Sequence, residues 1–135
     1  MTTEIVQRLE EIGQDTLAYP FKIEPLPGEE KVYRVVVDGQ PEFPIAMSEA
    51  DGELLCMVRL FGTDEIAEGR RDDLFETMLA GNLTLPLSTF GLTDGAVYLF
   101  GSLSAASRTE VIVEEIQALA GNTVEALELV QDYLT

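Results

Sequence analysis

The stretch that decides the fold is residues 31–61, KVYRVVVDGQPEFPIAMSEADGELLCMVRLF. Its first part, residues 31–37, is rich in Val and Tyr, which favour β-strands. It ends at Asp38-Gly39, a pair favoured at hairpin turns because both central residues of a type I′ turn need positive φ. Apolar residues then alternate through residues 43–47, and a second turn signal follows at Asp51-Gly52. This pattern predicts two strands joined by a tight turn, with a third strand to follow.

The third strand is predicted at residues 53–61. Its sequence is apolar on much of both faces, which is typical of a strand in the centre of a sheet. One face carries Leu54, Cys56, Val58 and Leu60. The stretch as a whole therefore predicts an antiparallel meander.

Residues before the meander predict a helix and an edge strand. Thr2 or Thr3 followed by Glu4 can cap a helix. The apolar positions of that helix recur at helical spacing, at Ile5, Val6, Leu9, Ile12 and Leu17. Residues 21–26 are short and interrupted by proline, which indicates a strand at the edge of the sheet.

Residues after the meander predict a short helix and a second hairpin. The helix contains Leu74, Phe75, Met78 and Leu79 and ends at Gly81-Asn82, which supply left-handed residues. The hairpin consists of residues 83–92 and 96–103, joined by a turn at residues 93–95.

The last and longest helix is predicted to begin at a capping box, Ser107-Arg108-Thr109-Glu110. Gly121-Asn122 is expected to kink it. At about 27 residues, or roughly 40 Å, it is longer than a small sheet covers, which predicts that part of it lies in a homodimer interface. Its apolar stripe is Ile112, Ile116, Leu119, Thr123, Leu127, Val130 and Leu134, widened by Val113, Ala120 and Val124.

Together these elements predict an α+β fold: an antiparallel sheet flanked by an N-terminal helix, a short middle helix and a long C-terminal helix. The chain has 135 residues and no internal repeat or linker, so we expect a single domain over residues 1–135.

The charge is strongly negative, with 25 acidic residues against 8 basic ones and a formal net charge of -17. Nucleic acids and anionic membranes are bound through clusters of Lys and Arg, so direct binding to either is not expected. Such a surface either keeps the chain soluble or attracts a basic partner. We expect a cytoplasmic protein, because the sequence has a single cysteine, Cys56, and neither a signal peptide nor a membrane-spanning segment.

The chain contains no histidine, which removes the commonest general base and metal ligand. Cys56 occupies a strand position that predicts a buried, inert thiol. Ser107 is assigned to the helix cap, and Ser102 and Ser104 to a strand end. The acids Asp64, Glu65, Glu68, Asp72, Asp73 and Glu76 are interpreted as a solvated surface rather than as acid-base or metal-binding groups. We therefore predict no catalytic, cofactor-binding or metal-binding residues, and no enzyme activity.

Several C-terminal segments resemble the YjfI family of small, acidic bacterial proteins. They are LPLSTFGL at residues 85–92, FGSLSA at 100–105, VEEI at 113–116 and EALE at 125–128. The resemblance implies a fold similar to that of type III secretion chaperones. It also implies a partner among phage-shock-type coiled-coil proteins, which act at the inner membrane.

The leading hypothesis is a non-catalytic module, chaperone-like or adaptor-like, that binds a basic or amphipathic segment of another protein. Two alternatives remain open: an enzyme that uses carboxylates alone or with Mg²⁺, and an acidic mimic of nucleic acid.

Overall fold

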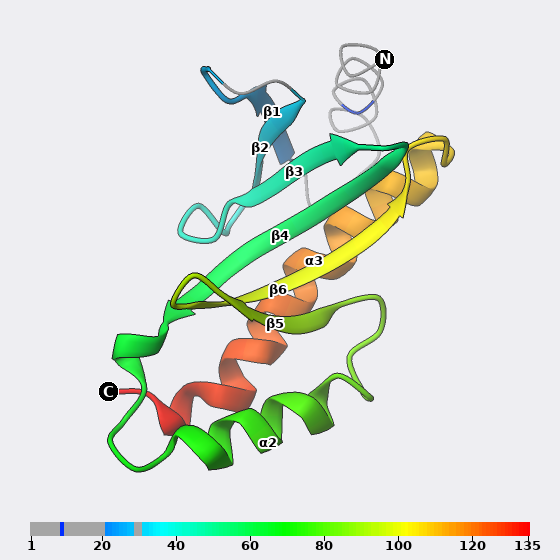
Figure 1. Cartoon of the computed structure of the whole chain (residues 1–135). Coiled ribbons are helices and arrows are strands. Elements are labelled where there is room, and N and C mark those ends of the chain that lie inside the picture. The colour runs from blue at the N-terminus through cyan, green and yellow to red at the C-terminus, as the bar shows by residue number, and fades with distance from the viewer. Residues whose placement is uncertain (1–8, 10–20, 29–30) are drawn as a thin grey trace.

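The computed structural model describes Leu9, residues 21–28 and residues 31–135. Six antiparallel strands form one sheet in the order β1-β2-β3-β4-β6-β5 (Figure 1). The strands are β1 (Phe21–Pro25), β2 (Val32–Val37), β3 (Ile45–Ala50), β4 (Glu53–Gly62), β5 (Thr89–Thr93) and β6 (Ala96–Ser104). The predicted α+β class, the edge position of β1 and the inner position of β4 are confirmed.

Two of the three predicted tight turns are present. Asp51 and Gly52 both have positive φ, of 52° and 78°, and join β3 to β4. Asp94 and Gly95, at 50° and 73°, join β5 to β6 in the same way. Asp and Gly tolerate these angles better than other residues, so the sequence is a reliable guide here.

The turn predicted at Asp38-Gly39 is wrong in type. Only Gly39 has positive φ, 87°, and the Gln40 amide donates to the Val37 carbonyl at 2.9 Å. The chain then continues to Pro44 before β3 begins, so β2 and β3 are joined by a seven-residue loop rather than a two-residue turn. Phe43, expected in the strand, lies in this loop and packs on the core.

Two helices accompany the sheet, α2 (Arg71–Gly81) and α3 (Thr109–Val130). Leu74 and Met78 of α2 are buried, as expected from its pattern, whereas Leu79 is exposed. The predicted left-handed end of α2 is wrong, because Asn82 is right-handed, with φ -61°. Asn82 Oδ1 instead accepts a hydrogen bond from the Phe90 amide at 2.7 Å, which ties the end of α2 to β5.

Helix α3 differs from the predicted helix at both ends. Its N-cap is Arg108 rather than Ser107, and no side-chain hydrogen bond caps it. The Ser107 amide is already used in a turn, where it donates to the Ser104 carbonyl at 3.0 Å. The helix has 22 residues, continues without interruption through Gly121 and Asn122, and gives way to a 3-10 turn, η2 (Gln131–Tyr133). It is therefore shorter than the helix on which the homodimer prediction rested.

The C-terminal end is fastened to the segment between β4 and α2, which includes the 3-10 turn η1 (Thr63–Glu65). The Ala67 amide donates to the Tyr133 carbonyl at 2.8 Å, and the Tyr133 hydroxyl lies 2.9 Å from Thr77 Oγ1. The Arg70 guanidinium lies 4.6 Å from the centre of the Tyr133 ring. Tyr133, which was predicted to lie in the last helix, therefore holds the C-terminal end against this segment.

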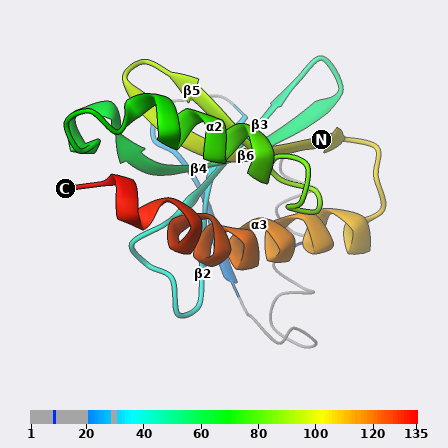
Figure 2. The same cartoon turned by 90° about the horizontal axis from the view of Figure 1, so that it is seen from below.

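The core lies between one face of the sheet and α3, which crosses behind β4 and β6 in Figure 1 and is seen from below in Figure 2. Alternating positions of β4 point into it, as predicted from the sequence. The predicted N-terminal helix lies outside the described residues, except that Leu9 is helical and fully buried. The fully buried larger side chains are Leu9, Val35, Ile45, Met47, Leu54, Val58, Leu74, Val97, Leu99, Ile112, Ile116 and Leu119.

Candidate functional site

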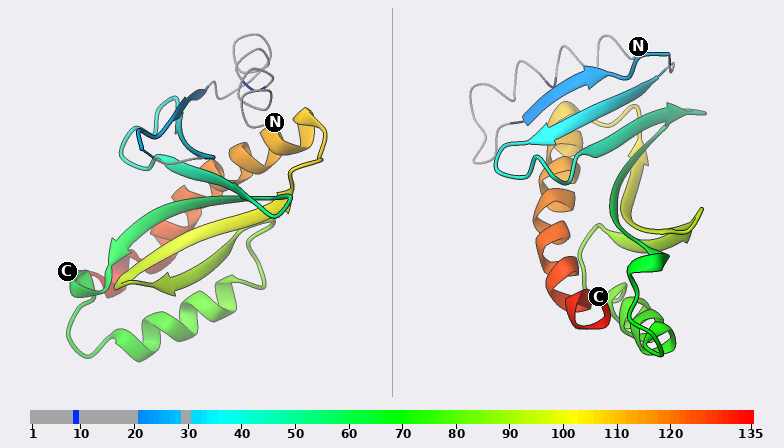
Figure 3. Two further views of the ribbon diagram at one scale, coloured as in Figure 1. Left: turned by 45° about the horizontal axis from the view of Figure 1, so that its top comes forward. Right: turned by 90° about the vertical axis from the view of Figure 1, so that its left-hand side faces the viewer.

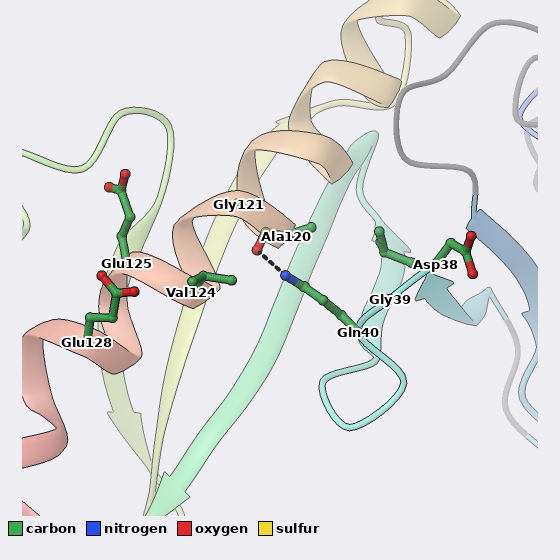
Figure 4. Close-up of a pocket in the computed structure, with 9 residues that line it drawn as sticks. Asp38, Gly39, Gln40, Ala120, Gly121, Val124, Glu125 and Glu128 are labelled. Atoms are coloured by element: carbon green, nitrogen blue, oxygen red, sulfur yellow. Dashed lines mark hydrogen bonds between the residues drawn. The ribbon is translucent and has the colours of Figure 1, made fainter.

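A groove lies between the C-terminal half of α3 and the loop that joins β2 to β3 (Figure 4). Gln40, in the middle of that loop, donates from Nε2 to the Ala120 carbonyl at 3.1 Å. This bond holds the loop against the helix across a sequence separation of 80 residues. The longer loop that replaces the expected tight turn therefore forms one wall of the groove.

Two hollows make up the groove, with volumes of about 560 Å³ and 400 Å³. They adjoin each other, because both are lined by Gly39, Gln40, Val124 and Glu128. The floor is largely apolar, and Val124 leaves 46% of its surface exposed within it. The other apolar residues that line it are Val37, Phe43, Ala120, Leu127 and Leu134.

The charged residues that line the groove are all acidic: Asp38, Glu42, Glu125 and Glu128. In Figure 4, Glu125 and Glu128 project from the helix on one side, and Asp38 lies on the loop side. Acids on both walls of an apolar floor give the groove a negative potential around an apolar centre. The arrangement suits a segment that is itself apolar along one side and positively charged at its flanks.

The sequence identified the acidity of the chain but missed this groove. Val124 was assigned to the core-facing stripe of the last helix, and it is the residue of that stripe that is most exposed. The only sign of the groove in the sequence was an apolar residue, Val124, beside the acidic Glu125 and Glu128. The opposite wall could not be predicted, because it comes from a loop 80 residues away in the chain.

The acids expected to form a solvated surface are spread over η1, the following loop and α2. Glu65 Oε2 accepts a hydrogen bond from the Gly62 amide at 2.7 Å, and Asp73 lies 3.9 Å from Arg70. Within the described part of the chain, no group of three or more His, Cys, Asp or Glu side chains is placed to hold a metal ion. Ser102 and Ser104 are exposed at the end of β6, and Ser104 Oγ accepts a bond from the Ala106 amide at 3.1 Å.

Cys56 lies on the core face of β4 and is fully buried, as predicted. Burial raises the pKa of its thiol to about 12, and the nearby Glu115 carboxylate adds to the shift. The thiolate is the nucleophilic form of cysteine, so the thiol is inert at neutral pH.

Alkylation of Cys56 by iodoacetamide at pH 8 is expected to be at least about tenfold slower in the native protein than in guanidinium chloride. Mass spectrometry of the two time courses measures this directly. Equal rates in both conditions would show that the thiol is accessible and would contradict its assignment to the core.

A second feature missed by the sequence is Glu115, which lies on the buried side of α3 with 6% of its surface exposed. Its Oε1 atom has no hydrogen-bond partner among the described residues, and burial raises the pKa of its carboxyl. It packs against Gly101 of β6 and lies close to the Leu87 carbonyl. Its position three residues after Ile112 and four before Leu119 could have revealed this burial.

Asn122 fastens the loop that covers Glu115. Its Nδ2 atom donates to the Pro86 carbonyl at 2.6 Å and to Ser88 Oγ at 2.9 Å. Leu87, between these partners, has a positive φ of 67° and an exposed side chain. This polar cluster is enclosed, and we assign it to the architecture of the fold rather than to a binding site.

The described helices include none that combines the length and the apolar character needed to cross a membrane.

Solved structures with the same fold include components of protein complexes. The HopA1-SchA chaperone-effector complex contains a chain with a TM-score of 0.61 and 14% identity, covering 94% of each chain. The heterodimeric ExoU-SpcU complex from the type III secretion system of Pseudomonas aeruginosa contains another, with a TM-score of 0.59 and 14% identity, covering 95% of this chain and 98% of that one. At these identities the likeness shows the fold alone, and it confirms the expected similarity to type III secretion chaperones.

A third structure with this fold is YbjN from E. coli, described as a putative transcription regulator. It has a TM-score of 0.68 and 12% identity, and the match covers 100% of this chain and 95% of that one. No curated protein sequence matches the chain. A family model of bacterial proteins matches residues 2–134, which is nearly the whole sequence. The chain therefore belongs to the family described as "Uncharacterized protein conserved in bacteria (DUF2170)".

Proposed function

We propose that the protein is a non-catalytic, chaperone-like or adaptor-like module that binds a basic, amphipathic segment of another protein in the groove between α3 and the β2–β3 loop. The observation that carries the proposal is the combination of an apolar floor with acids on both walls. Apolar area supplies binding free energy, and the acids select a basic partner and speed its association.

Two further observations support a protein as the partner. Two structures of the same fold are complexes with another protein, according to their descriptions. The groove also runs beside α3 from Ala120 to the end of the helix at Val130, roughly 15 Å at 1.5 Å per residue, which is the length of about three helical turns. A segment of this length matches helix-in-groove recognition.

The non-catalytic part of the proposal rests on the absence of histidine from the sequence and on the protonated, buried thiol of Cys56. We do not propose the two alternatives, a carboxylate- or Mg²⁺-dependent enzyme and a nucleic-acid mimic. An apolar floor between the acids suits a protein segment better than a metal ion or the imitation of a phosphate backbone. We further infer a cytoplasmic protein whose residues 1–135 form a single domain. The homodimer, the YjfI assignment and a phage-shock-type partner stay predictions.

A synthetic amphipathic peptide with Leu on one face and Lys on the other, about 18 residues long, should bind the protein, because it supplies both features of the expected partner. Glu125→Lys combined with Glu128→Lys is expected to weaken this binding by about tenfold at low salt. Fluorescence anisotropy at about 50 mM and about 500 mM salt measures the affinity and its electrostatic share.

The matched control is Glu110→Lys with Glu114→Lys, which makes the same change of charge on exposed positions of the same helix outside the groove. It should leave the affinity within about twofold when the two pairs are compared at about 0.15 M salt, where screening acts over about 8 Å. Equal weakening by both pairs would mean that the peptide senses the net charge alone, and the groove would no longer be the site.

A further inference from the structure

The face of the sheet opposite α3 has no described helix over it, as the side view in Figure 3 shows. Side chains that alternate with the core residues of each strand point to this open face. The register places Arg34, Ala46, Met57, Phe100 and Thr89 in one row across five strands. The next row includes Arg59, Tyr98 and Gly91.

The centre of the open face is apolar and shallowly hollowed. The hollow has a volume of about 320 Å³, and its lining, which carries no charge, is Leu55, Met57, Gly91, Leu92, Thr93, Tyr98 and Phe100. A Cβ atom on Gly91 would lie 2.9 Å from Phe100 Cε1. The glycine therefore lets the Phe100 ring lie close over β5 and extend the apolar platform.

The strands of this face carry a small excess of basic side chains, whereas the molecule as a whole is strongly acidic. Its strands direct three basic side chains outward, Lys22, Arg34 and Arg59, against the acids Glu24 and Glu53. The whole chain has 8 basic and 25 acidic residues. Glu24 lies directly opposite Arg34 in the register, and Arg59 Nη2 and Asp64 Oδ1 both lie within 3.0 Å of the point where a Cβ atom on Gly62 would be. Neither acid forms an ion pair with its arginine, and among the described residues the only such pair is Arg70 with Asp73.

Aromatic residues, Met and Arg are the residue types enriched in the cores of protein interfaces, and Arg pairs with carboxylates through two parallel hydrogen bonds. We propose that the open face is a second docking surface, and that it takes a protein segment that carries apolar side chains and carboxylates. The chain thus presents two sites of opposite charge preference, the acidic groove and the open face.

The high net negative charge does not prevent this. Glu125 and Glu128 of the groove lie on α3, on the other face of the sheet, and charges separated by more than the Debye length of about 8 Å at physiological salt are largely screened. The local side chains, Arg34 and Arg59, decide which segment the face attracts.

The test uses a peptide with Leu on one face and Glu on the other, matched in length to the Leu/Lys peptide. The intact protein should bind it, and Arg34→Gln with Arg59→Gln should weaken the binding by about tenfold. Phe100→Ala should weaken it as well, through loss of the apolar platform, and thermal unfolding of each variant verifies its fold. Glu125→Lys with Glu128→Lys should leave the Leu/Glu peptide unaffected, because it alters only the groove.

The matched control is Arg71→Gln with Arg108→Gln, two exposed positions away from the sheet that lose the same charge. Equal weakening by the control pair, or no binding of the Leu/Glu peptide by a folded protein, would overturn the proposal. Self-association in sedimentation that Phe100→Ala abolishes would make a second copy the occupant and overturn it too. Because the groove variants act on the other peptide, each proposal can fail without the other.

Discussion

Replacing Gly101 with alanine is expected to lower the free energy of unfolding by roughly 2–4 kcal/mol, the largest effect of a Gly-to-Ala change among the glycines that the structure describes. Gly101 lies in the middle of β6, opposite Cys56 of β4, on the face that packs against α3. A Cβ atom there would overlap Glu115 Oε1 and would lie 2.8 Å from the Leu87 carbonyl oxygen.

The penalty is large because neither neighbour can easily retreat. Glu115 is held on α3 among buried side chains, and the Leu87 carbonyl is backbone in a loop that Asn122 fastens through Pro86 and Ser88. Chemical denaturation with a linear extrapolation measures the effect.

Two further variants test whether the loss of stability comes from the clash with Glu115. Glu115→Ala introduced with Gly101→Ala should recover part of the lost stability, because it removes the carboxyl but leaves the Leu87 carbonyl in place, and a double-mutant cycle isolates this coupling. Gly121→Ala is the control, since a Cβ there meets nothing within 4 Å and alanine favours a helix by about 0.5–1 kcal/mol. A Gly101→Ala protein as stable as the Gly121→Ala protein would contradict the packing described for Glu115.

Replacing Glu115 with glutamine is expected to stabilise the protein at pH 8 by about 1–3 kcal/mol, the usual cost of a buried group without a hydrogen-bond partner. Gln has the same shape but no charge, and its amide can donate to a carbonyl nearby. The gain should depend on pH, because the cost in the natural protein comes from the ionised carboxylate.

The direction follows from the raised pKa of Glu115. Below its usual value of 4.5, the carboxyl is protonated in both the folded and the unfolded chain, and its burial carries no charge cost. As the pH rises above 4.5, the unfolded chain releases its proton first, so the free energy of unfolding falls until the folded carboxyl ionises as well. The advantage of Glu115→Gln should therefore be absent below about pH 4 and grow as the pH rises.

Denaturation of both proteins from about pH 3 to about pH 8, compared at each pH, separates this effect from the many surface acids that the two proteins share. An advantage that stays constant with pH would mean that the charge of Glu115 is not responsible. An advantage that grows toward acid pH would reverse the assigned direction.

Much of the sheet could be predicted from local sequence. The alternation in residues 53–61 placed β4 inside the sheet, and Asp51-Gly52 and Asp94-Gly95 adopted the expected turns. These features depend on preferences of single residues and of neighbours in the chain, so they can be predicted without knowledge of the rest of the fold.

Helix ends were predicted less well, because other parts of the chain competed for the same groups. Ser107 satisfied the sequence pattern of a capping box, but its amide is bonded to Ser104 in the turn before α3. Gly81 was predicted to end the helix in a left-handed conformation. A Cβ atom on it would lie 2.9 Å from Leu129 Cδ2 of α3, so a glycine at this position allows the two helices to pack closely.

The sequence by itself determined the class of the fold, the order of its elements from β1 to α3 and the burial of Cys56, since hydrophobic period and turn chemistry are local properties. Only the tertiary structure decided what the acidic charge can do. It brought Asp38 and Glu42 of the β2–β3 loop and Glu125 and Glu128 of α3 to line one apolar groove, and gathered three of the few basic residues on the opposite side of the sheet. The net charge of -17 does not say where on the surface the charges lie. Strand register and loop length decide that, and both depend on contacts between residues far apart in the chain.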